Sequence, residues 1–174
     1  MPDGFEDIFT SRSTREMPDL EHVFSIRLRF ERVQRVGAMP TGATRGAVYV
    51  DEGVISGPKL NGRAVPNSGG DYAMFRPDGV VSFDAVYMLE ADDGALILMR
   101  NRGYLWGRKP GVMDRIHKWV MGEGPSVDFE DYYLRSFPTF ECPEGPHEWL
   151  MRHVIIGIGE RMGDGNLIRY YALT

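Results

Sequence analysis

The segment between residues 57 and 72 reads GPKLNGRAVPNSGGDY, and the rest of the chain is arranged around it. It joins two strand-like segments and contains four glycines and two prolines in sixteen residues. Because Gly allows close backbone approach and Pro fixes φ, the Gly-Pro and Gly-Gly steps predict tight turns rather than a flexible spacer. Near its end, Asp71 can be directed at a ligand by a rigid loop, or it can cap a turn through its own backbone.

Strand-like patterns flank this loop on both sides. Residues 24–30 (FSIRLRF) alternate strictly between apolar and polar side chains, as a strand with one buried face requires. The strands predicted in the first part of the chain span residues 24–30, 46–50, 53–56, 72–76, 80–90 and 95–101. The last two are expected to pair as a hairpin, because the Asp93-Gly94 step between them is a strong turn signal.

One helix is predicted, in residues 110–121. Val112, Ile116 and Trp119 recur there at helical spacing, and Gly122 can end the helix in a left-handed conformation. We expect this amphipathic helix to cover one end of a barrel. Further strands are predicted at residues 132–140, 148–157 and 167–173. Many short strands with a single helix predict an all-β, mainly antiparallel barrel or sandwich.

Several of these segments carry a family resemblance. The segments are 57–62 (GPKLNG), 66–72 (PNSGGDY), 76–79 (RPDG), 92–97 (DDGALI), 132–141 (YYLRSFPTFE) and 149–152 (WLMR). In this order, across roughly residues 22–173, the chain resembles the bacterial and fungal family called DUF3237 or UPF0311. The resemblance implies a closed antiparallel β-barrel of the calycin kind, and it implies no activity, because the family's function is unassigned.

Composition limits the class of protein. A chain of 174 residues with 43% hydrophobic content can bury one core, so we expect a single barrel domain at residues 21–174 after a polar extension at residues 1–20. The net charge of −5 argues against nucleic acid as a partner. The single cysteine, Cys142, favours a structural role in a reducing compartment. With no apolar run near the about 18 residues of a membrane helix and no signal-peptide pattern, we expect a cytoplasmic protein without a membrane partner.

Sequence motifs for cofactors and metals are incomplete. Residues 157–163 (GIGERMG) resemble a dinucleotide fingerprint, but the helix and the further strand of a Rossmann unit have no room before the end of the sequence. We therefore interpret these glycines as a bend or bulge in a barrel strand. The four histidines form no HxH or HExxH pattern. No cofactor and no metal ligand are assigned.

Charged and phenolic residues within the strand patterns are the remaining candidates. The candidate catalytic residues are Asp71, Glu141 and Tyr87, and the candidate ligand-binding residues are Asn61, Arg76, Asp84, Tyr104, Arg135 and Arg152.

Side chains of a strand alternate between its two faces, and this alternation predicts the orientation of two candidates, Tyr87 and Arg135. It places Tyr87 on the apolar face of residues 83–89, so Tyr87 is predicted to point inward. It also groups Arg135 with Tyr133 and Phe137. An interior Arg135 needs a carboxylate or an anionic ligand, and its expected partner is Asp71, Asp84 or Glu141. A purely structural ion pair would satisfy the same requirement.

Two functions fit these candidates, and a third needs none of them. The first is a cofactor-independent enzyme of isomerase, lyase or cyclase type, in which Asp71 or Glu141 acts as general acid or base on an apolar or aromatic metabolite. The second is a non-catalytic carrier or sensor of the same ligand class. The third is a structural barrel that forms a homodimer, and a barrel filled with side chains would favour it.

Overall fold

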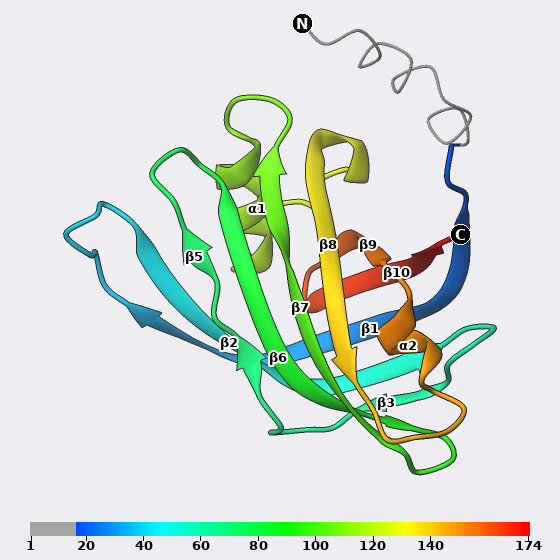
Figure 1. Cartoon of the computed structure of the whole chain (residues 1–174). Helices are drawn as coiled ribbons and strands as arrows, with labels where there is room; N and C mark the ends of the chain where they lie inside the picture. Colours follow the sequence, from blue (N-terminus) through cyan, green and yellow to red (C-terminus); the bar gives the residue numbers. More distant parts are fainter. Residues whose placement is uncertain (1–16) are drawn as a thin grey trace, which may run out of the picture.

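In the computed structural model, which describes residues 17–174 apart from the side chain of Arg32, one antiparallel sheet curls into a barrel (Figure 1). The strands are β1 (Leu20–Val36), β2 (Thr44–Ser56), β3 (Gly62–Ala64), β4 (Gly70–Asp71), β5 (Met74–Phe75), β6 (Val81–Ala91), β7 (Leu96–Gly107), β8 (Tyr132–Glu141), β9 (Ile155–Met162) and β10 (Gly165–Leu173). The helices are α1 (Val112–Val120), a 3-10 turn (Phe129–Asp131) and α2 (Trp149–Arg152). The predicted extension lies almost wholly outside the described residues.

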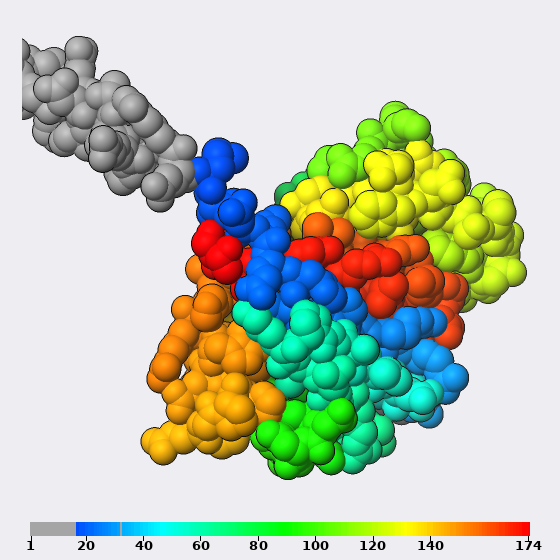
Figure 2. All heavy atoms as spheres, turned by 90° about the vertical axis from the view of Figure 1, so that its right-hand side faces the viewer, coloured from blue at the N-terminus to red at the C-terminus, as the bar shows by residue number. Residues whose placement is uncertain are grey.

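The barrel is closed by pairing between β1 and β2. Strand order runs β1, β10, β9, β8, β7, β6, β3, β2, and β1 then pairs with both β10 and β2. Figure 2 shows β1 in blue between β10 in red and β2 in cyan on the outer surface. The short strands β4 and β5 fill the space between β2 and β6. The predicted antiparallel closed barrel is therefore confirmed.

Several predicted strands need correction. Of the strand predicted at residues 72–76, only Met74–Phe75 is formed, as β5. Residues 46–50 and 53–56 belong to one strand, β2, which continues through Asp51 and Glu52. Residues 148–157 are not a strand throughout: α2 occupies Trp149–Arg152 and β9 starts only at Ile155. The consecutive apolar residues Trp149 and Leu150 break the alternation of a strand, and both pack against the core on the helix instead.

Glycines in the opening loop are explained by close backbone approach. A Cβ on Gly57 would lie 2.3 Å from Phe24 Cα, and a Cβ on Gly69 would lie 1.9 Å from the carbonyl oxygen of Val86. Of the bend or bulge predicted at residues 157–163, the bulge is wrong, since β9 pairs with β10 without a register shift. A Cβ on Gly157 would instead meet Ser136 Oγ at 2.1 Å, so close packing explains that glycine.

The hydrophobic core fills one end of the barrel. It includes Phe24 and Ile26 of β1, whose predicted inward face is confirmed, and Leu150 of α2. A second cluster gathers around Val112 and Ile116 of α1. In Figure 1, α1 follows the upper end of β7 and α2 follows the lower end of β8. The two ends of the barrel are therefore covered differently.

Within the described residues, no helix has the length and apolar character needed to cross a membrane.

Candidate functional site

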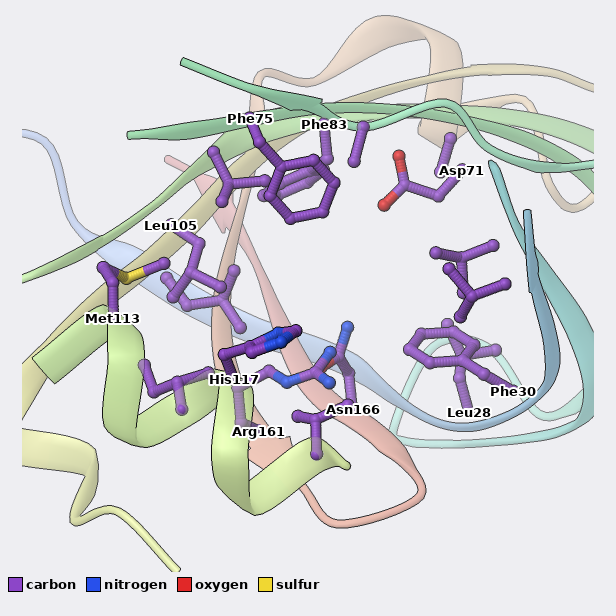
Figure 3. A pocket seen from close by; sticks show the side chains of 18 of the residues that line it. Leu28, Phe30, Asp71, Phe75, Phe83, Leu105, Met113, His117, Arg161 and Asn166 are labelled. Carbon is purple, nitrogen blue, oxygen red and sulfur yellow. The ribbon is translucent and has the colours of Figure 1, made fainter. Parts of the chain in front are cut away.

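A cavity of about 490 Å³ lies inside the barrel at the end that carries α1. Most of its wall is apolar: β1 contributes Leu28 and Phe30, and β6 contributes Val81 and Phe83 (Figure 3). Its floor is shared with the core, since the residues common to both are Leu28, Val50, Ala85, Tyr87 and Ile168. The interior is therefore not filled by side chains, and its volume lies in the range of small-molecule sites.

Helix α1 forms the wall nearest the open end. Gly111 precedes it with φ 77°, and Gly122 follows with φ 74°, so both ends use the left-handed conformation that glycine adopts without strain. Ile116 is buried, and Met113 and His117 also line the cavity. The predicted helix at residues 110–121 is thus confirmed, and its apolar face closes part of the cavity.

Asp71 is the acidic group inside the cavity. It lies in β4, where Val48 of β2 and Ala85 of β6 flank it in register. Its Oδ1 accepts a hydrogen bond from the backbone N–H of Asp84 at 3.1 Å, and its carboxylate points into the cavity (Figure 3). Burial raises the pKa of Asp71 from 3.8 to about 7, although the Asp84 N–H and the charge of Arg161 lower it. The carboxyl group is therefore divided between its two protonation states near neutral pH.

Arg161 lies on the opposite wall, at the end of β9. Its Nη1 donates a hydrogen bond to Asn166 Oδ1 at 2.8 Å, and its guanidinium carbon lies 5.9 Å from the centre of the Phe30 ring. Burial lowers the pKa of Arg161 to about 10, against the effects of Tyr132 and Asp71, which raise it. Among the ion pairs of the described residues, none joins Arg161 to Asp71. The two opposite charges face each other across the cavity (Figure 3).

The floor carries polar atoms without hydrogen-bond partners. The hydroxyl of Tyr87 and the Oδ1 of Asn101 are buried, and neither has a hydrogen-bond partner among residues 17–174. Asn101 is held from its other side, where Nδ2 donates to the hydroxyl of Tyr170 at 3.1 Å. Burial, and then the charge of Asp71, raise the pKa of Tyr87, so its hydroxyl stays protonated and available as a donor.

Three of the predicted site residues line the cavity. Asp71 and Tyr87 lie inside it, and Arg76 lies exposed at its mouth, where it forms an ion pair with Asp78. The inward orientation predicted for Tyr87 is confirmed by its 2% exposure.

The other predicted residues lie outside the cavity. The prediction that Arg135 faces the interior is wrong. Leu134 and Ser136 point inward from β8, whereas Arg135 lies outside with its guanidinium carbon 5.1 Å from the centre of the Tyr133 ring and 5.5 Å from that of Phe129. This outer stacking removes the need for an interior carboxylate.

Most of the other predicted site residues form surface ion pairs or hydrogen bonds within a loop. Asp84 accepts two hydrogen bonds from Arg100 at 2.8 and 2.6 Å on the outer face of β6. Asn61 hydrogen-bonds both backbone groups of Gly57 and so closes the loop. The residues exposed outside the cavity are Tyr104, Glu141 and Arg152, the last of which pairs with Glu148.

Sequence reasoning missed Arg161, Asn101 and His117. A signal for Arg161 was present: Gly157 and Gly159 are buried positions of β9, and a period of two places residue 161 on the same face of the strand. Asn101 follows the buried Ile97 and Met99 by the same period in β7. His117 offers no comparable signal, because an exposed histidine on an amphipathic helix is common. Within the described part of the chain, no group of three or more metal-binding side chains occurs.

The fold and site together define a closed antiparallel β-barrel protein with a mostly apolar internal cavity, whose enclosed part holds the acidic side chain of Asp71 and the basic side chain of Arg161. Residues 18–173 match the family model described as a protein of unknown function, DUF3237, so the chain belongs to this family.

Relatives of this chain are similar to it along most of their own length. A UPF0311 protein of Clostridium acetobutylicum is 30% identical over 154 residues, which cover 88% of this chain and 93% of the relative. The crystal structure of a conserved protein of unknown function from Rhodopseudomonas palustris is similar with a TM-score of 0.80 and 25% identity, over 91% of this chain and 99% of that one. A structure described as an enzyme from Penicillium herquei has a TM-score of 0.66 and 18% identity over 91% and 96% of the two chains, which shows a shared fold alone.

Proposed function

We propose that this protein is a cofactor-independent enzyme that transfers protons on an apolar or aromatic small molecule, in an isomerase, lyase or cyclase type of reaction. The observation that carries the proposal is the Asp71 carboxyl group, which lies inside an apolar cavity with a pKa of about 7; among the described residues, only its Oδ1 accepts a hydrogen bond. A general acid or base works best when its pKa lies near the operating pH. Asp71 meets this requirement because burial opposes its ionisation.

In the proposed reaction, Asp71 transfers the proton and Tyr87 stabilises the developing negative charge. Asp71 takes a proton from a carbon next to a carbonyl group, or from a hydroxyl group that then attacks, and returns it at a second position of the same substrate. The unpaired hydroxyl of Tyr87 lies on the floor near Asp71 and donates a hydrogen bond to the substrate oxygen on which negative charge develops. The apolar wall excludes water and strengthens both interactions. That a protein of this fold is described as an enzyme is consistent with catalysis here.

The test is a turnover screen with matched variants. Wild type, Asp71→Asn and the control Asp51→Asn are incubated with a set of aromatic, polyketide and terpenoid carbonyl compounds, and products are followed by mass spectrometry. Asp51 is an exposed carboxylate paired with Arg29 on the outside of the barrel. We expect Asp71→Asn to lower the turnover rate by about 100-fold or more, with Asp51→Asn unchanged.

The outcomes separate the alternatives. Compounds that bind wild type without conversion, and whose affinity alone changes in Asp71→Asn, would replace the enzyme by a carrier or sensor. Undiminished turnover in Asp71→Asn would refute the role of Asp71.

A further inference from the structure

The cavity contains a cation, Arg161, that forms no ion pair with any described residue. Of the acidic, basic and histidine residues that line it, those at the mouth are exposed: Glu31, Arg35, Arg76, Asp114, His117 and Asp164. Only Asp71 and Arg161 among the described lining residues carry charge and are largely enclosed by protein atoms. The charge state of the interior is therefore decided by these two groups.

Within the part of the chain that the structure describes, Arg161 has no close counter-ion. Its hydrogen-bond acceptor is the neutral amide oxygen of Asn166, and its Nε is buried without a partner. Asp71 forms no described ion pair with it and is protonated in a large part of the molecules near neutral pH. In those molecules the guanidinium is the only interior charge of the described lining. A buried cation without a partner costs several kcal/mol, and a bound anion reduces that cost.

The surroundings of Arg161 also prepare it for an anion. Asn166 holds Nη1 from β10, and the Phe30 ring of β1 packs near the guanidinium carbon, so the side chain is restrained from two neighbouring strands. A planar guanidinium presents parallel N–H groups that match the two oxygens of a carboxylate. The remaining wall is apolar and suits a hydrocarbon or aromatic body.

From this geometry we infer that the ligand is an amphipathic organic carboxylate, whose anionic group binds Arg161 and whose apolar body extends across the cavity to Asp71. The inference rests on the proposed function, because it concerns the ligand of the same cavity. It adds a substrate class and a direction of binding: the reacting position lies at the Asp71 wall, away from the carboxylate. Arg161 is thereby the residue that selects charged over neutral ligands.

The experiment compares two probes of nearly the same shape. Binding of 2-naphthoate and of its neutral amide, 2-naphthamide, is measured by isothermal titration calorimetry at pH 6, where Asp71 is mostly protonated. For wild type we expect naphthoate to bind about tenfold more tightly or better, as a hydrogen bond to a charged group implies. For Arg161→Gln we expect this preference to disappear, and for Arg161→Lys to be reduced.

Controls keep the result interpretable. Arg135→Gln removes an arginine from the outside of β8 and should leave the preference for naphthoate unchanged. Circular dichroism and the melting temperature establish that each variant is folded, and Arg161→Lys serves if Arg161→Gln does not fold. Equal affinity of wild type for both probes, no binding of either, or a preference that survives in a folded Arg161 variant would overturn the inference.

Ligand preference and turnover can be lost independently, so the two measurements test the ligand class and the proposed function separately. In Asp71→Asn the preference for naphthoate should persist, because Arg161 is intact, whereas turnover should be lost. A protein that converts neutral compounds only would keep the role of Asp71 and remove that of Arg161. A protein that prefers naphthoate but converts nothing would do the reverse.

Discussion

Replacing Asp71 by Asn should change how the free energy of unfolding depends on pH. Burial raises the pKa of the Asp71 carboxyl in the folded protein from 3.8 to about 7. Between these two values the folded state keeps a proton that the unfolded state has lost. Stability therefore falls as pH rises through this window and levels off above pH 7. Asn keeps an oxygen that can accept the hydrogen bond from the Asp84 N–H, but it cannot ionise.

The size of this change in the free energy of unfolding follows from the raised pKa of Asp71. Each pKa unit corresponds to about 1.36 kcal/mol, so between pH 4.5 and pH 7 the ionisation of Asp71 costs wild type about 3 kcal/mol (2.5 units × 1.36). Asp71→Asn is free of this cost. Relative to wild type, the variant should therefore gain about 3 kcal/mol between pH 4.5 and pH 8.5, whatever the two stabilities are at the lower pH.

The assay is urea denaturation of wild type, Asp71→Asn and Asp51→Asn at five pH values from 4.5 to 8.5. Subtracting the curves removes the contributions of the groups that all three proteins share. Asp51→Asn should run parallel to wild type in this range, because Asp51 lies on the surface. Parallel curves for wild type and Asp71→Asn would refute the reasoning, and with it the claim that Asp71 is available as a base near neutral pH.

Three further predictions concern single positions. Tyr87→Phe removes a buried hydroxyl without a partner, so the free energy of unfolding should stay the same or rise by about 1 kcal/mol while turnover falls; a clear loss of stability in urea denaturation would show that the hydroxyl is paired. Gly69→Ala places a Cβ 1.9 Å from the Val86 oxygen and should cost about 1–3 kcal/mol, whereas the control Gly37→Ala, with nothing within 4 Å, should leave the melting temperature nearly unchanged. Arg135→Ala removes an outer stacking contact and should cost less than about 1 kcal/mol, with no change in ligand affinity by calorimetry.

How far sequence reasoning reached depends on whether the two faces of a strand differ in polarity. In residues 24–30 one face is apolar and the other polar, and in residues 83–89 Tyr87 shares a face with Phe83, Ala85 and Leu89. Both assignments of the interior were confirmed, because only one register buries the apolar face. The hairpin at Asp93-Gly94 was likewise predictable from local turn chemistry, and β6 pairs with β7 around it.

Strand β8 lacked this contrast. Tyr133 and Phe137 made the face of Arg135 look interior, but the opposite face carries Leu134 and Phe140 and is the buried one. Aromatic rings are accepted on the outside here because arginines stack on them: Arg102 on Phe137, and Arg135 on Tyr133. Alternation alone cannot rank two apolar faces, so the prediction for Arg135 failed.

The sequence by itself determined the family, the antiparallel barrel, the helix near its open end and the presence of Asp71 at the end of a rigid glycine-rich loop. The strands, the helix and the loop depend on local backbone requirements and on alternation within single strands, which are written in consecutive residues, whereas the closed barrel was implied by the resemblance to the DUF3237 family. Only the tertiary structure decided that Asp71 faces Arg161 across a cavity with the unpaired Tyr87 hydroxyl on its floor. The shifted pKa values arise from burial by residues of several strands, and no short segment encodes that burial.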